Sequence, residues 1–316
     1  MRRLSWKAWL GGSAAIVLLA VAIVLVWQWP LWAAQSSFDG DQAYEYLVEI
    51  CKLGRRPSGS EGMAKQQEML KRHFEDLGGK VEFQKFEHRW HPGVKFANLI
   101  VQWHPRAKDR VLLGAHYDTR PYPDRDPRNP RGTFIGANDG ASGVAVLMEL
   151  AKSMPKLESK YGVDFVLFDA EEYIFRVEAD QKEYCLGSEY FALQYSKDKS
   201  REHRYVWGVV MDMVGDADLQ IFKEKNSLRT QKGSQLVRDI WAAAGRVGVR
   251  EFYSRVEHEV TDDHVPLNNI AKIPTCDIID FDYPYWHTEG DVPERCSAAS
   301  LSKVGRVVLE WLKTAR

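Results

Sequence analysis

The stretch VLLGAHYD, residues 111–118, is a short apolar run that ends in the polar group His116-Tyr-Asp118. From here to the C-terminus, apolar runs at 164–168, 205–211 and 273–279 alternate with stretches of helical periodicity at 142–153, 188–195, 234–244 and 297–313. Apolar strands that alternate with helices are typical of a parallel sheet with helices on both of its faces. We therefore expect an α/β fold with a mostly parallel, mixed sheet.

Two helices and a strand pair precede this region. Residues 41–53 and 61–77 have helical periodicity, and Ser60 is positioned to cap the second helix. Apolar residues at 80–88 and 97–103 predict two antiparallel strands. Long loops, such as 120–135 and 173–186, usually serve the active site of such a fold.

Composition excludes several classes of protein. The chain has 316 residues, of which 45% are hydrophobic and 28% charged, so it is globular rather than disordered. The formal charge of −1 predicts no general attraction to nucleic acid. The four cysteines, Cys51, Cys185, Cys276 and Cys296, have no CxxC spacing, which excludes a zinc ribbon and a thioredoxin-like motif. They leave room for one or two disulfides, but their spacing does not give the pairing.

The N-terminal segment predicts a membrane anchor. Basic residues occur only near the start, and residues 8–29 are uncharged, which is close to the roughly 20 residues that span a bilayer. We expect a signal anchor in residues 1–35 that places the catalytic domain, residues 36–316, on the periplasmic or luminal side. A signal peptide cleaved near residues 33–34 is the alternative and would release a secreted domain.

Polar residues that follow the apolar runs are the candidate site. In an open α/β sheet, ligands bind beyond the carboxyl ends of the strands. Single features such as the pair Glu171-Glu172 or the turn around Asp139 are common in proteins without a site. Together with His116 and His287, however, they predict a cluster of carboxylates and imidazoles, which suits zinc.

The order of these motifs resembles the zinc peptidase family M28. The matching motifs are HYD (116–118), GAND (136–139), FDAEE (168–172), LGS (186–188), DMVG (212–215), DDH (262–264) and WHT (286–288). Within this family the chain is most similar to the animal-type glutaminyl-peptide cyclotransferases. The similarity rests on Trp286 before His287, on Asp262 and Asp263 before a histidine, and on an insertion after Glu172.

The resemblance implies a zinc aminopeptidase-like fold and one zinc ion held by Asp139, Glu172 and His287, with the fourth ligand position open. It implies cyclisation of an N-terminal glutamine of a peptide or protein to pyroglutamate, with release of ammonia. The partners it implies are therefore substrates with a free N-terminus.

The resemblance also implies the roles of other residues in the reaction. Glu171 would be the proton shuttle, and Asp212 and Asp262 would form an acidic hydrogen-bond chain that tunes it. Trp286 would line the pocket for the glutamine side chain.

Two other functions stay open at this stage. His116, Asp139, Glu172, Asp212 and His287 are also the five ligand types of a two-zinc aminopeptidase that removes N-terminal residues. In a one-zinc enzyme, His116 and Asp118 would instead lie behind the metal ligands. A non-catalytic peptide-binding domain is the third candidate, and the presence of Glu171 argues against it because a binding module needs no general base.

Overall fold

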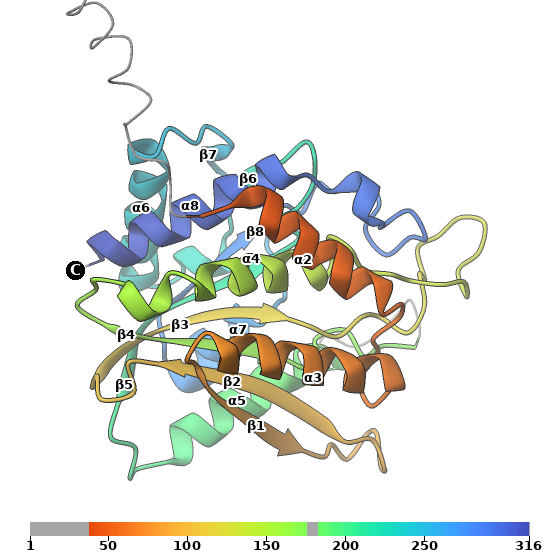
Figure 1. Ribbon diagram of the computed structural model, residues 1–316, viewed down its shortest axis with the longest axis horizontal. Helices are drawn as coiled ribbons and strands as arrows, with labels where there is room; N and C mark the ends of the chain where they lie inside the picture. Colours follow the sequence, from red (N-terminus) through yellow and green to blue (C-terminus); the bar gives the residue numbers. More distant parts are fainter. Residues whose placement is uncertain (1–37, 176–182, 316) are drawn as a thin grey trace, which may run out of the picture. The chain divides into compact units, whose positions relative to one another are not determined.

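The central sheet contains the predicted strands and gives their order in space (Figure 1). The computed structural model describes residues 38–175 and 183–315. The six strands run in the order β1-β2-β4-β3-β5-β8 across the sheet. They are β1 (Lys80–Phe86), β2 (Phe96–Trp103), β3 (Asp109–His116), β4 (Gly162–Phe168), β5 (Arg204–Asp212) and β8 (Thr275–Ile279).

The sheet is mixed and mostly parallel, which confirms the predicted fold class. Strand β3 pairs in parallel with β4 and β5, and β5 pairs in parallel with β8. The predicted antiparallel pair at the N-terminal end is also confirmed, with Lys80 opposite Gln102 and Phe86 opposite Phe96. Strand β2 is antiparallel to β4 as well.

The helices start and end within a few residues of the predicted positions. The longer ones are α2 (Gly40–Lys52), α3 (Glu61–Asp76), α4 (Ala141–Ala151), α5 (Leu186–Lys197), α6 (Gln231–Arg246) and α8 (Ala298–Thr314). The predicted cap is confirmed, because the side chain of Ser60 accepts a hydrogen bond from the Met63 N–H at 3.1 Å. Ser297 caps α8 in the same way through the Ser300 N–H.

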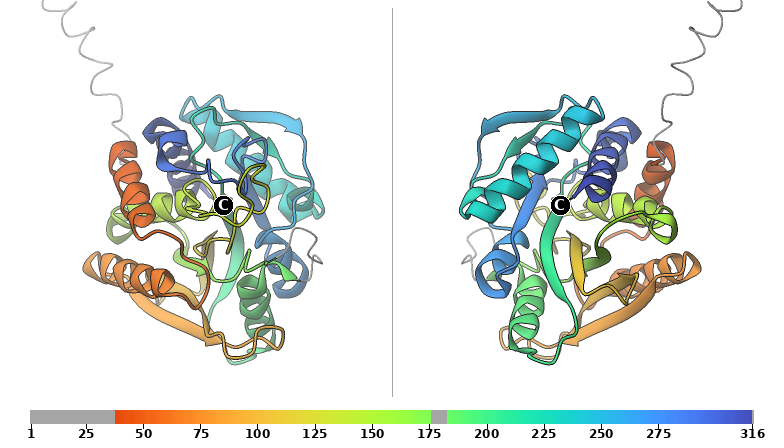
Figure 2. Two further views of the ribbon diagram at one scale, coloured as in Figure 1. Left: turned by 90° about the vertical axis from the view of Figure 1, so that its right-hand side faces the viewer. Right: turned by 90° about the vertical axis from the view of Figure 1, so that its left-hand side faces the viewer.

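Helices cover both faces of the sheet (Figure 2). Side chains alternate along β3, so Val111 and Leu113 join the main core with α2, α3, α4, α6 and α8. Leu112 points to the opposite face, where it packs with Phe191 of α5. Strand β4 is buried along its whole length, which explains why residues 165–168 are apolar in succession rather than alternating with polar residues. Its one charged residue, Asp164, is buried and accepts a hydrogen bond from Arg110.

A second, two-stranded sheet was not predicted. It pairs β6 (Ile221–Lys223) with β7 (Phe252–Val256) in parallel. β6 has only three residues, and most of β7 is exposed, so neither segment has the apolar pattern that marks the central strands. A three-residue helix, α7 (His264–Pro266), and a π-helical turn (Leu267–Ala271) precede β8.

The four cysteines are free and buried, so none of them pairs in a disulfide. Within the described ranges, no helix combines the length and the apolar character needed to cross a membrane. The membrane anchor predicted for residues 1–35 lies outside those ranges.

Candidate active site

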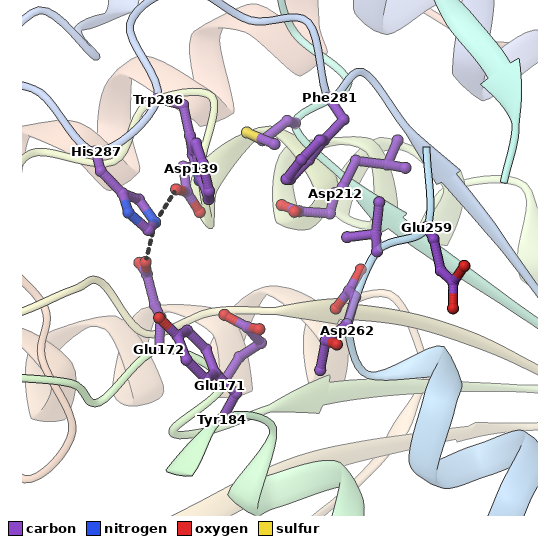
Figure 3. A pocket seen from close by; sticks show the side chains of 14 residues that line it. Asp139, Glu171, Glu172, Tyr184, Asp212, Glu259, Asp262, Phe281, Trp286 and His287 are labelled. Atoms are coloured by element: carbon purple, nitrogen blue, oxygen red, sulfur yellow. Dashed lines mark ion pairs between the residues drawn. The ribbon is translucent and has the colours of Figure 1, made fainter. Parts of the chain in front are cut away.

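The polar residues that follow the strands line one pocket (Figure 3). Its volume is about 190 Å³, which is small enough to enclose a single side chain. The lining residues are Asp139, Glu171, Glu172, Tyr184, Asp212, Met213, Glu259, Val260, Thr261, Asp262, Ile279, Phe281, Trp286 and His287. Of the residues to which the sequence analysis gives a metal, catalytic or substrate role, His116 and Asp118 lie outside this wall.

Asp139, Glu172 and His287 lie together although they come from three distant segments. Asp139 belongs to the turn before α4, Glu172 follows β4, and His287 lies in the loop after β8. The His287 Nε2 atom is 3.5 Å from Asp139 Oδ2 and 3.3 Å from Glu172 Oε2 (Figure 3). All three side chains are buried, and one ligand atom of each lies within 4.8 Å of the others.

The residues present fit a zinc ion. Asp139 Oδ2 and Glu172 Oε2 are buried and accept no hydrogen bond. Two buried carboxylate oxygens that face the same imidazole nitrogen are costly unless a cation lies among them. Burial lowers the pKa of His287, which favours the neutral imidazole that ligates metals. Two carboxylates and one imidazole are a known donor set for zinc, with one position left open.

Asp124 and Arg120 support this group from behind. The His287 Nδ1 atom is 3.4 Å from Asp124 Oδ1, and the Arg120 guanidinium holds Asp124 through two hydrogen bonds of 2.8 Å. Burial opposes ionisation of Asp124, but His287 and Arg120 outweigh it and lower the Asp124 pKa. The Arg120 N–H also donates to Glu172 Oε1 at 2.6 Å. A carboxylate on the second nitrogen of a ligand histidine fixes the orientation of the ring.

Glu171 points into the pocket beside Glu172 (Figure 3). Its backbone is held by Asp118, whose two oxygens accept hydrogen bonds from the N–H groups of Glu171 at 3.0 Å and Glu172 at 3.3 Å. Burial raises the pKa of Glu171 well above its ordinary value, and the negative charges of Asp262 and Asp263 act in the same direction. Asp118 thus lies behind the site and fixes the pair of glutamates.

His116 forms a second group with Asp139 and Asp212. Its Nε2 atom lies 3.1 Å from Asp139 Oδ1 and 3.1 Å from Asp212 Oδ1. Burial opposes protonation of His116, but Asp212, Asp118 and Asp139 outweigh it and raise the His116 pKa well above its ordinary value. Burial also raises the pKa of Asp212 to about 7. In this group the His116 Nε2 atom has carboxylate partners, whereas the buried Nδ1 atom of the same ring makes no hydrogen bond.

Aromatic side chains form one wall of the pocket. Trp286 lies over His287 with ring centroids 4.2 Å apart and contacts Phe281 at 4.9 Å. The guanidinium of Arg125 stacks on Trp286 at 4.0 Å from the ring centroid. Tyr184 lines the opposite side, next to Glu171 (Figure 3). The pocket therefore combines a polar, acidic end with an apolar aromatic wall.

Sequence reasoning missed several of these residues. Asp124 and Arg125 lie in the long loop 120–135. The length of this loop predicts that it serves the site, but it does not single out either residue. Tyr184 and Phe281 do not belong to any of the sequence motifs, so nothing in the sequence marks them as site residues. Only the path of the loops brings them to the pocket.

Fold and site together define an α/β enzyme with a zinc-type centre at the carboxyl ends of its strands. A family model described as peptidase family M28 matches residues 98–312. The solved structure of a glutaminyl cyclase from Fimbriiglobus ruber is 40% identical, covers 88% of this chain and 96% of its own, and has a TM-score of 0.83.

Other similar proteins include one described as an aminopeptidase and one described as a cyclotransferase. A leucine aminopeptidase precursor from Bacteroides thetaiotaomicron is 30% identical, with a TM-score of 0.82 over 88% of this chain and 98% of that structure. A curated glutaminyl-peptide cyclotransferase from Gloydius blomhoffii is 24% identical over 82% of this chain and 78% of its own length. The chain belongs to peptidase family M28 and, within it, to the group of the glutaminyl cyclases.

Proposed function

We propose that this protein is a zinc-dependent glutaminyl-peptide cyclotransferase. Its substrate is a peptide or protein with a free N-terminal glutamine. The α-amine attacks the γ-carboxamide carbon of the same residue, so that a new C–N bond closes the five-membered lactam. The bond to the amide nitrogen breaks, and ammonia leaves. No water is consumed, and both reacting groups belong to one residue.

The observation that carries this proposal is the position of Glu171. Its carboxyl group lies in the pocket next to the Asp139, Glu172 and His287 group but outside it. A raised pKa suits a group that must accept a proton near neutral pH and return it. Glu171 takes a proton from the α-amine as the ring closes and donates one to the departing nitrogen.

Other residues of the chain bind and orient the substrate. Trp286, Phe281 and Tyr184 enclose the methylene groups of the glutamine side chain and exclude water, which favours ring closure over hydrolysis. Asp262 lies within 4.8 Å of Glu171, and its negative charge helps to raise the Glu171 pKa. Asp212 lines the same pocket but pairs with His116. Asp139, Glu172 and His287 would hold the zinc ion, which would supply Lewis-acid polarisation of the γ-carbonyl group.

One zinc ion is the stoichiometry that we propose. At the first group, Asp139 Oδ2 and Glu172 Oε2 are buried oxygens without a hydrogen-bond partner. By contrast, the His116 Nε2 atom already has a hydrogen-bond partner in Asp212. His116 then acts as a support for Asp139 rather than as a ligand.

A two-zinc aminopeptidase is the second candidate. His116, Asp139 and Asp212 each offer a ligand atom within 4.8 Å of the others, as a second metal would require. The structural similarity to a leucine aminopeptidase precursor also favours it. In that enzyme Glu171 would activate a water molecule instead of an amine.

One assay distinguishes the two functions. The purified full-length protein is incubated with one peptide that begins with glutamine and one that begins with leucine, and products are followed by mass spectrometry. We expect loss of ammonia from the first peptide and no change in the second. Free leucine from the second peptide, with no ammonia from the first, would reject the cyclotransferase in favour of the aminopeptidase.

We further propose that residues 1–35 anchor the protein in a membrane and that residues 36–316 form the catalytic domain on its periplasmic or luminal side. The uncharged stretch 8–29 after three basic residues supports this orientation. Membrane fractionation followed by protease treatment of intact cells or spheroplasts tests it. Activity in the soluble fraction would instead indicate a cleaved signal or a cytosolic protein.

A further inference from the structure

Cys185 contacts the candidate base at two points. Its backbone N–H donates a hydrogen bond to the carbonyl oxygen of Glu171 at 2.8 Å. Its thiol lies 3.5 Å from Glu171 Oε1, which is hydrogen-bond distance for sulfur. The same residue therefore holds both the main chain and the carboxyl group of Glu171.

The backbone around this contact is unusual. Cys185 has φ 59° and ψ 32°, in the left-handed region, and Ala170 on the other side of Glu171 has φ 58°. The two segments are joined, because the Leu186 N–H donates to the Ala170 carbonyl oxygen at 3.0 Å. Residues other than glycine adopt this conformation at a cost, and such strain often marks functional sites.

The thiol is a neutral donor and not a nucleophile. Cys185 is 3% exposed. Burial raises its pKa well above the ordinary value, and the negative charges of Glu171, Asp263 and Asp262 act in the same direction. The group therefore remains S–H. Because a thiol is a weak donor, it can orient a carboxylate without withdrawing much of its charge.

We propose that Cys185 is a positioning residue for Glu171. Its thiol donates to Oε1 and selects one orientation of the carboxyl group, which leaves the second oxygen for the substrate amine. The backbone hydrogen bond joins the Glu171 main chain to the residue that precedes α5. This inference rests on the proposed role of Glu171, and it adds a residue that neither the metal group nor the aromatic wall contains.

The test compares Cys185→Ala and Cys185→Ser with Cys51→Ala, which removes a buried thiol from α2. The readouts are kcat and KM for the glutamine peptide, zinc content and the midpoint of thermal unfolding. We expect Cys185→Ala to lower kcat about five- to tenfold with KM changed less than about twofold, as for one lost hydrogen bond. Cys185→Ser keeps a donor and restores most of kcat, and Cys51→Ala leaves kcat unchanged.

Dividing kcat by bound zinc removes the effect of any unfolded fraction. The proposal is overturned if Cys185→Ala keeps the parent kcat, or if the serine and alanine variants lose the same factor. A parent protein that does not cyclise the glutamine peptide refutes the proposed function instead. In that case the kcat of each Cys185 variant is compared with that of the parent on the leucine peptide. Failure of the proposed function is thereby distinguished from failure of the positioning role of Cys185.

Discussion

Backbone conformation at single positions points to the pocket. Ala170, Cys185, Met213 and His287 have left-handed φ angles of 58°, 59°, 48° and 56° although none is glycine. Ala170 precedes the glutamate pair, and Met213 follows Asp212. Each such residue costs roughly 1 kcal/mol relative to an ordinary backbone. The surrounding fold must stabilise these turns, and they aim the functional side chains into one cavity.

Replacing Glu171 by glutamine removes the base but keeps the shape of the side chain. We expect Glu171→Gln to lower kcat by about 10²- to 10⁴-fold, the usual contribution of general acid–base catalysis. The zinc content should stay at the parent level because Glu171 is not in the ligand group. Ammonia release and elemental analysis provide the two measurements. Loss of zinc in proportion to activity would assign Glu171 to the metal instead.

The change His116→Ala tests the number of metal ions. With one zinc on Asp139, Glu172 and His287, we expect the zinc content per chain to stay near one, while kcat falls because Asp139 loses a neighbour. With two zinc ions the content should fall by about half, since His116 would be a ligand of the second. Zinc analysis after gel filtration decides between these results.

The packing of α4 against β5 helps to position Asp139. Gly143 lies in the first turn of this helix, and a Cβ atom there would be 2.2 Å from the Met211 carbonyl oxygen and 2.9 Å from Ala115 Cβ. Only glycine permits so close an approach. The turn that contains Asp139 directly precedes the helix, so its place in the pocket depends on this distance.

Replacing glycine by alanine should therefore change the free energy of unfolding in opposite directions at two helical positions. Gly143→Ala should lower the free energy of unfolding by about 1–3 kcal/mol, as overpacked cores do. Gly245→Ala in α6 should raise it by up to about 1 kcal/mol, because a Cβ atom there meets nothing within 4 Å and alanine favours the helix. Urea denaturation of both variants gives the comparison. Equal effects would show that the close contact at Gly143 relaxes without cost.

For the molecule as a whole, Glu224 links stability to pH. It is buried, and its oxygens accept hydrogen bonds from the N–H groups of Asn226, Ser227 and Val260 at 2.7 to 3.1 Å. The His264 Nε2 atom lies 3.1 Å away. Burial alone would raise the Glu224 pKa, but His264 and the backbone donors outweigh it and lower the pKa from 4.5 to about 2.

The sign of the pH effect follows from this lowered pKa. The ionised form stabilises the fold fully above pH 4.5, and the contribution is lost as the pH falls toward about 2. Its size is roughly 2 to 3 kcal/mol at neutral pH. Glu224→Gln should therefore unfold at a lower temperature than the parent at pH 7, with a difference that shrinks between pH 4.5 and pH 2. A difference that does not depend on pH would contradict the assignment.

Much of the fold could be predicted because its signals are local. The buried strand β4 ends in four successive apolar residues, and the helices that follow Ser60 and Ser297 have their caps in the sequence. The weak pair β6 and β7 could not be predicted, since three residues and an exposed strand have no distinctive pattern. Its pairing depends on contacts between segments that are distant in sequence.

The candidate site likewise has a part that the sequence predicts and a part that only the tertiary structure shows. Sequence alone determined that Asp139, Glu172 and His287 follow strands or open a helix, and parallel strands bring their carboxyl ends to one edge. Only the tertiary structure placed Asp124 against His287 and Cys185 against Glu171. These contacts depend on the paths of long loops, which no periodicity encodes. Periodic elements follow from local chemistry, whereas the supports of the site are set by packing across the whole chain.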